Sequence, residues 1–304
     1  MKNILIVINP KAGTGVEPDF EHRIKSHCES EEVQCTIYWT EGNDDERRIS
    51  DLLAGNKFDA IFSVGGDGTF TLVAGLAVKK KVQVAIIPMG TSNGLASDLG
   101  IDSDPFNEFK RLLKSNHSLK LDRIVVNGEQ SFYHIGDIGA NANLIKRFEK
   151  SDDSGYAAYT KHVYKELKSE EAFNYEIHTG ENTYSGKARM IAICNARRFG
   201  TKVALNHQSH PADGLFELIV FRELNFKTLI ESGLSSIWEG FDVLTTDKKE
   251  VIQTQSAKVR ISPETFYQLD GEVLGRAEEL NLNLHRGAVD LICPNNCPYL
   301  DARG

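Results

Sequence analysis

The sequence predicts an α/β domain built on a doubly wound parallel sheet, followed by a second domain of antiparallel β-strands. In the first third of the chain, short apolar segments alternate with helix-like segments of about 10 to 15 residues, the pattern of βαβ units in a parallel sheet. Beyond about residue 116 the pattern changes. Residues 119–126 alternate between polar and apolar residues, Asn127-Gly128 is a hairpin turn signal, and the chain from residue 173 onward is mostly typical of strands. Glycine-rich turns follow three of the early apolar segments, where parallel sheets bind ligands.

The first domain is expected to cover residues 1–118. Acidic residues open its segment 44–54, as is typical of a helix N-terminus. Its strands are predicted at the apolar segments 3–8, 33–39, 60–64 and 84–87, and its helices at residues 17–30, 44–54 and 68–78.

The second domain is expected to cover residues 119–294, with a C-terminal tail at residues 295–304. Helices are predicted at residues 149–169 and 226–238. Strands are predicted at residues 119–126, 130–135, 173–178, 188–195, 215–221, 251–261, 280–285 and 289–293. We expect these strands to form an antiparallel sheet or sandwich, and the active site to lie in a cleft between the two domains.

Composition narrows the class of protein. The chain has 304 residues, of which 40% are hydrophobic and 26% charged, so it is expected to be globular. Its formal net charge of −8 argues against nucleic acid as the main partner. No apolar run approaches the roughly 20 residues of a transmembrane helix, and the N-terminus does not resemble a secretory signal. The five cysteines, an odd number without metal-ligand spacing, indicate free thiols in a reducing cytoplasm. Oligomeric state stays open, a homodimer included.

The sharpest motif is Gly65-Gly66-Asp67-Gly68-Thr69, between a buried strand and a helix. Glycines let the backbone approach a ligand closely, and a helix start offers unpaired N–H groups to phosphate. A carboxylate at Asp67 suits such a site if Mg²⁺ lies between it and the phosphates. The alternative is a tight turn with Asp67 as the helix N-cap.

Two further loops have related sequences. Gly90-Thr91-Ser92-Asn93-Gly94 follows the fourth predicted strand, and Asn9-Pro10-Lys11-Ala12-Gly13 follows the first. Neither is a Walker A loop, which needs G-x-x-x-x-G-K-[ST]. Because the three loops leave strands of one sheet at the same edge, together they predict a nucleotide cradle.

These motifs resemble the catalytic domain of diacylglycerol kinases and their relatives, the bacterial lipid kinases and sphingosine kinases. The resemblance extends to Gly136-Asp137-Ile138-Gly139, Pro211-Ala212-Asp213-Gly214-Leu215 and Asp270-Gly271-Glu272, and so covers nearly the whole chain. It implies the two-domain fold that this family shares with NAD kinases, ATP as phosphoryl donor, Mg²⁺, and a lipid hydroxyl at a membrane surface as acceptor.

The resemblance also assigns roles to residues. Asp67 would organise magnesium near the phosphates, and Asp213 with the main-chain carbonyls of His210 and Leu215 would form a second magnesium site. Glu272 is favoured as the proton acceptor, with Asp270 as its electrostatic or magnesium-linked partner, although the reverse assignment stays open. The residues implied for ATP binding are Asn9, Pro10, Lys11, Ala12, Gly13, Thr40, Gly65, Gly66, Asp67, Gly68, Thr69, Phe70, Thr71, Leu72, Thr91 and Asn93.

One departure leaves the acceptor open. Bacterial diacylglycerol kinases usually carry an acidic residue and an aromatic one after the motif's asparagine, where this chain has Gly94 and Leu95. Diacylglycerol, a sphingoid base, phosphatidylglycerol and an undecaprenyl-like alcohol are all candidate acceptors. Two alternatives remain: an NAD kinase, and an inactive protein of the same fold that binds nucleotide or lipid.

Overall fold

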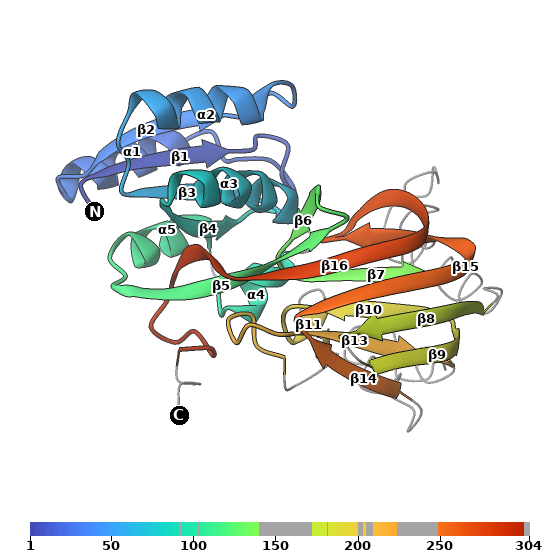
Figure 1. Cartoon of the computed structure of the whole chain (residues 1–304). Helices are drawn as coiled ribbons and strands as arrows, with labels where there is room; N and C mark the ends of the chain where they lie inside the picture. Colours follow the sequence, from blue (N-terminus) through green and yellow to red (C-terminus); the bar gives the residue numbers. More distant parts are fainter. Residues whose placement is uncertain are drawn as a thin grey trace, which may run out of the picture. The chain divides into compact units, whose positions relative to one another are not determined.

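The computed structural model describes residues 1–90, 93–101, 104–139, 172–180, 182–199, 203–204, 209–223 and 249–300. The chain divides into two compact units (Figure 1). The first unit consists of Met1–Asp122 and Arg286–Gly304, and the second of Arg123–His285. Residues 286–294, which we expected in the second domain, therefore group with the first unit.

The first unit contains the predicted parallel sheet. Its strands are β1 (Asn3–Ile8), β2 (Gln34–Trp39), β3 (Ala60–Gly65) and β4 (Gln83–Pro88). They pair in parallel in the order β2-β1-β3-β4. β1 and β3 are buried almost throughout, as strands with covered faces are in α/β folds.

Five helices are described in this unit. They are α1 (Phe20–Ser30), α2 (Asp45–Gly55), α3 (Asp67–Lys80), α4 (Gly94–Asp98) and α5 (Pro105–Leu113). The first three connect successive strands of the sheet, as predicted. α5 was not predicted, although its local signals are clear. Pro105 occupies the first turn, and the Asp104 side chain accepts a hydrogen bond from the main-chain N–H of Asn107 at 3.0 Å.

The strand order fixes where a ligand can bind. β2 joins one side of β1 and β3 joins the other, so the connections from β1 and β3 leave in opposite directions. Such a reversal opens a crevice at the carboxyl ends of the two strands, the usual ligand site of open α/β sheets. Asn9 and Gly66 directly follow these two ends.

The second unit is antiparallel. Its central strands run in the order β14-β13-β10-β7-β15, and β15 also pairs with β8 and with the first part of β16. The strands from residue 117 onward are β5 (His117–Val126), β6 (Gln130–Phe132), β7 (Ile135–Gly139), β8 (Phe173–Thr179), β9 (Asn182–Ala188), β10 (Met190–Cys194), β11 (Arg198–Phe199), β12 (Val203–Ala204), β13 (Phe216–Phe221), β14 (Lys249–Thr254), β15 (Ser256–Leu269) and β16 (Glu272–Cys293). The predicted fold class, a parallel α/β sheet followed by an antiparallel β region, is confirmed.

Four predicted strands are divided or merged in the structure. Residues 251–261 form two strands, β14 and β15, because the Thr254 hydroxyl accepts a hydrogen bond from the Ser256 amide at 3.3 Å and turns the chain. No Gly or Pro marks that break. Residues 280–285 and 289–293 both belong to β16, which continues through Gly287. Residues 130–135 are divided between β6 and β7, and the helices predicted at residues 149–169 and 226–238 lie outside the described residues.

Candidate active site

The loop after β1 is fastened to the start of α3 by one side chain. The Asn9 amide N–H donates to the Val64 carbonyl oxygen at 2.9 Å. The Asn9 side chain donates through Nδ2 to Thr69 Oγ1 at 3.3 Å and accepts the Lys11 N–H through Oδ1 at 2.9 Å. Asn9 therefore fixes the first loop, residues 9–13, beside the second loop, residues 65–69.

The glycines of the three loops allow their backbones to touch. A Cβ atom on Gly90 would lie 2.6 Å from the Cα of Gly66 and 2.8 Å from Oδ1 of Asn93. A Cβ on Gly13, whose φ is 56°, would overlap the carbonyl oxygen of Met89. Only glycine fits at these two positions without displacing a neighbouring loop, so the loops that the sequence placed at one edge do form one cradle.

The start of α3 presents main-chain N–H groups of the kind that bind anions. α3 begins at Asp67, and its N-cap Gly66 offers no side chain to the N–H groups of the first turn. These groups lack intrahelical acceptors, and the helix dipole adds partial positive charge. Asp67 is thus the first helical residue, so the alternative reading of Asp67 as the N-cap is wrong.

Asp67 contacts the loop after β4. Its Oδ2 accepts the Gly94 N–H at 3.3 Å, and the residue is half-buried. Asn93, with φ of 44°, uses its side chain inside its own loop: Oδ1 accepts the Gly90 N–H at 2.8 Å and Nδ2 donates to the Gly90 carbonyl at 2.6 Å. Gly94 thus supplies a main-chain donor to Asp67. Thr91 lies outside the described residues.

The loop after β2 is organised by Asp45. Its Oδ1 accepts the Tyr38 hydroxyl at 2.7 Å and the Glu41 N–H at 3.0 Å, and its Oδ2 accepts the Gly42 N–H at 2.8 Å. Burial acts to raise the pKa of Asp45, but these hydrogen bonds outweigh it, so the pKa lies below its ordinary value of 3.8. Thr40, within the same loop, donates its N–H to the Ile8 carbonyl at 2.9 Å.

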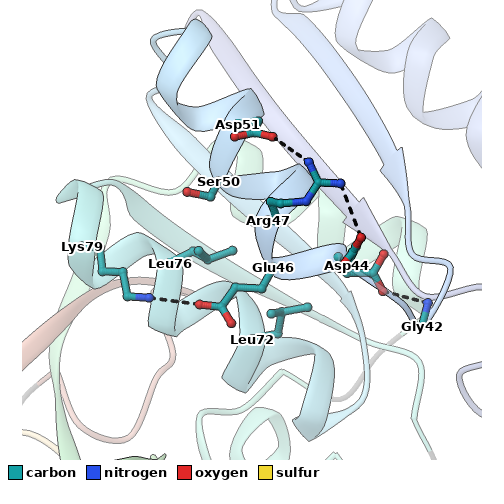
Figure 2. Close-up of a pocket in the computed structure, with 10 residues that line it drawn as sticks. Gly42, Asp44, Glu46, Arg47, Ser50, Asp51, Leu72, Leu76 and Lys79 are labelled. Carbon is teal, nitrogen blue, oxygen red and sulfur yellow. Dashed lines mark hydrogen bonds and ion pairs between the residues drawn. The ribbon is translucent and has the colours of Figure 1, made fainter.

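A depression of about 670 Å³ lies beside this loop, between α2 and α3 (Figure 2). Leu72 and Leu76 of α3 give it an apolar side. The rest of its lining is mostly charged, and comes from α2, the residues just before it, and Lys79 of α3. Figure 2 shows the charged residues in pairs: Lys79 with Glu46 at 3.0 Å, and Arg47 with both Asp44 at 3.4 Å and Asp51 at 3.6 Å. Leu72 is the implied ATP-binding residue that this depression includes.

In the second unit, Asp270 and Gly271 form the two-residue hairpin turn between β15 and β16. Their φ values of 47° and 89° are those of a type I′ turn, which Asp-Gly favours. Asp270 Oδ1 accepts the N–H groups of His134 at 3.0 Å and Ile135 at 3.1 Å, and its Oδ2 accepts that of Tyr133 at 3.0 Å. The Asp270 carboxylate is therefore an anchor that fastens the turn to the residues leading into β7.

Glu272 follows this turn as the first residue of β16 and is exposed. It pairs with Leu269 across the hairpin. Among the described residues, its carboxylate has no hydrogen-bond or ion-pair partner, so it is available to a substrate.

The turn that contains Asp213 precedes β13. Asp213 Oδ1 accepts the Leu215 N–H at 2.9 Å, and the Asp213 N–H donates to the His210 carbonyl at 3.4 Å. Just before it, the Ser209 hydroxyl donates to the buried Glu217 carboxyl at 2.5 Å. Burial raises the pKa of Glu217, and the Asp213 carboxylate acts in the same direction.

The antiparallel sheet brings these two acidic turns to one end. Leu269 of β15 pairs with Gly136 of β7, Ile135 pairs with Cys194 of β10, and Cys194 pairs with Glu217 of β13. The Asp270 and Asp213 turns therefore lie at the same end of four neighbouring strands, three strand spacings or roughly 14 Å apart.

A magnesium site at Asp213 would need main-chain carbonyl oxygens as ligands in addition to side chains. Within the part of the chain that the structure describes, no three His, Cys, Asp or Glu side chains are grouped so as to hold a metal ion. The turn instead offers the Asp213 carboxylate together with main-chain carbonyls, all oxygen donors of the kind that Mg²⁺ accepts. No hydrogen bond to Asp213 Oδ2 occurs within the described residues.

The sequence analysis missed several residues that organise these turns. Asp45, Glu217 and Gln268 were not singled out, although each makes the buried or part-buried hydrogen bonds of its turn. Glu217 and Gln268 stand next to apolar residues in strands, and that break in the apolar pattern is the signal that the sequence offers.

Among the described residues, no helix has the length and hydropathy to span a membrane.

Two family models match the chain. The diacylglycerol kinase catalytic domain matches residues 3–124, which contain the glycine cradle. The YegS C-terminal NAD kinase beta sandwich-like domain matches residues 137–293, which contain both acidic turns. The chain belongs to the diacylglycerol kinase family of the YegS type. The resemblance inferred from the motifs is confirmed.

Related proteins and solved structures are similar to the chain over nearly its whole length. The chain is 27% identical over 310 residues to proteins described as "Probable lipid kinase YegS-like" from Yersinia pestis (strain Pestoides F) and Yersinia pseudotuberculosis serotype O:1b (strain IP 31758), with 99% of this chain and 100% of each relative covered. A solved structure described as a diacylglycerol kinase from Bacillus anthracis str. Sterne has a TM-score of 0.71 at 20% identity and covers 97% of both chains. Another from the same organism has a TM-score of 0.75 at 21% identity, with 97% of this chain and 98% of that chain covered. At these identities the structures establish the fold alone.

Proposed function

We propose that this protein is an ATP- and magnesium-dependent kinase that transfers the γ-phosphoryl group of ATP to a hydroxyl of a lipid such as diacylglycerol or a sphingoid base. The observation that carries the proposal is the glycine cradle at the start of α3, in a chain with a diacylglycerol kinase catalytic domain. Its glycines remove the side chains that would fill it, and its free N–H groups suit phosphate.

The cradle residues hold the donor in this proposal. The first loop, residues 9–13, and the second loop with the start of α3, residues 65–72, surround the phosphates, with Thr91 and Asn93 from the third loop and Thr40 from the loop after β2. Asn93 fixes the conformation of its loop, because its side chain is hydrogen-bonded to both the N–H and the carbonyl oxygen of Gly90. Bound Mg-ATP supplies the phosphoryl group and neutralises the charge that develops during its transfer.

In this proposal Glu272 takes the proton of the acceptor hydroxyl. Its carboxylate is exposed and unpaired within the described residues, so one oxygen can take the proton of a lipid hydroxyl. The Asp270 carboxylate accepts hydrogen bonds from three main-chain N–H groups. These bonds support a role in fixing the turn rather than a role as proton acceptor.

Two carboxylates are proposed as magnesium ligands. Asp67 would lie beside the phosphates in the cradle, and Asp213 would act with the carbonyls of His210 and Leu215. Both ligand sets consist of oxygen atoms, as Mg²⁺ requires. The lipid would be reached at a membrane surface by a cytoplasmic protein in peripheral contact with it.

The test is transfer of radiolabelled γ-phosphate from Mg-ATP to a panel of lipids in mixed micelles, with NAD as a control acceptor. Label in one lipid is the expected result and identifies the head group. Label in NAD alone would make the protein an NAD kinase, and binding of ATP without transfer to any acceptor would contradict the proposed activity.

A further inference from the structure

A buried glutamine lies next to the hairpin turn that carries Glu272. Gln268 is near the end of β15 and is 1% exposed. Its Oε1 accepts the N–H of Gly271, in the turn itself, at 2.7 Å. Its Nε2 donates to Oδ2 of Asp137.

Asp137 is the other end of this connection. It lies on β7, directly across from Gln268 in the antiparallel register, and is fully buried. Buried polar side chains are costly unless they are hydrogen-bonded, so the two residues constrain each other. A glutamine carries both a donor and an acceptor on one amide, which lets Gln268 connect a carboxylate to a main-chain N–H.

The turn is therefore fastened at two successive residues. The Asp270 carboxylate holds one side through three main-chain N–H groups, and Gln268 holds the other through Gly271. Glu272 has no partner for its carboxylate among the described residues. Its position consequently depends on the backbone of the turn that precedes it.

We infer that Gln268 and Asp137 are a positioning pair that acts through Gly271 to hold Glu272 where it meets the acceptor hydroxyl. The inference rests on the proposed role of Glu272. Neither residue touches substrate in this scheme. Both belong to the second unit, whereas the loops at residues 9–13 and 65–72 belong to the first. Their loss should therefore lower kcat and leave KM for ATP nearly unchanged.

Swapping the amide of Gln268 and the carboxylate of Asp137 between the two positions provides the decisive test. Gln268→Glu keeps an acceptor for Gly271 but faces Asp137 with a second carboxylate. Asp137→Asn keeps one side-chain oxygen, which can still accept from the Gln268 amide, and adds a donor. We expect Gln268→Glu to lower kcat at least tenfold, because small displacements of reacting groups have large effects on rate. Asp137→Asn should lower kcat less, because the bond to Gln268 can be kept. The double variant restores one donor and one acceptor in reversed order, and its kcat should return to within about threefold of wild type.

Tyr267→Phe is the matched control. Tyr267 is the neighbouring residue of β15, and its hydroxyl donates to Gln130 Oε1 at 3.1 Å, away from the turn. Its loss should lower the thermal midpoint without changing kcat. A kcat loss equal to that of Gln268→Glu would mean that general destabilisation explains both, and would overturn the inference.

Amide hydrogen exchange separates this inference from the proposed function. In Gln268→Ala, the peptide containing Gly271 should exchange faster than in wild type, whatever the enzyme acts on. Unchanged exchange, or a double variant no better than the worse single variant, would overturn the positioning role. A wild-type protein that transfers phosphate to no lipid would instead overturn the proposed function, while faster exchange would still support the hold on the turn.

Discussion

Substitution of Gly90 by alanine tests the glycine cradle directly. The added Cβ would lie 2.6 Å from the Cα of Gly66, against at least 3.4 Å for an ordinary contact, so the second and third loops would have to part by about 0.8 Å. Both neighbours of the new atom on that side are backbone, which cannot rotate away. The Asn93 side chain, at 2.8 Å, would be displaced as well.

The size of the effect follows from that displacement. A shift of about 1 Å in a positioning group can lower a rate about 100-fold, so kcat/KM for ATP should fall by about that factor in Gly90→Ala. Overpacking should also lower the free energy of unfolding by about 1–3 kcal/mol, which leaves most of the protein folded.

Gly75→Ala is the matched control for this substitution. Gly75 lies within α3, and among the described residues its added Cβ would meet nothing within 4 Å besides its chain neighbours and the backbone of its own helix. The same change should there stabilise the protein by about 0.5–1 kcal/mol and leave the kinetics unaltered.

The assay combines steady-state phosphoryl transfer over a range of ATP concentrations, calorimetric ATP binding and thermal unfolding of both variants. If folded Gly90→Ala binds ATP and turns over like Gly75→Ala, the phosphates do not bind where these loops meet. The assignment of the cradle would then be refuted.

Three further predictions follow from the site. Asp67→Ala should abolish turnover and leave the thermal midpoint within a few degrees of wild type, because it removes a half-buried carboxylate and no core packing; near-full activity would contradict its role with magnesium. Glu272→Gln should lower kcat about 100-fold or more with little change in calorimetric ATP affinity, and equal losses in both would reassign Glu272 to nucleotide binding. The folded-state pKa of Asp45 lies below 3.8, so its stabilising effect is present above about pH 4 and is lost as the pH falls through that folded-state pKa. Asp45→Asn should therefore lower the thermal midpoint most near neutral pH, with a difference from wild type that disappears in acid; a difference independent of pH would show that the charge of Asp45 is not involved.

The βαβ pattern of the first unit could be read from the sequence because it is local. β1 has the predicted bounds, residues 3–8, and α1, α2 and α3 lie where the periodicity placed them to within a few residues. The break between β14 and β15 could not be read in this way. It depends on a hydroxyl-to-amide bond at Thr254, in a run without Gly or Pro.

The features of the site likewise divide into those that local sequence indicates and those that depend on tertiary contacts. By itself the sequence determined the glycine loops and the acidic turns, because a positive φ, a close backbone approach and an Asp-Gly turn each require particular residue types at particular spacings. Tertiary structure alone decided that Gly90 meets Gly66 and that the Asp270 carboxylate holds three N–H groups of residues 133–135. It alone also decided that Gln268 spans from Asp137 to Gly271. These contacts join residues up to 137 positions apart, and their partners are set by strand order and register, which no local pattern of residues records.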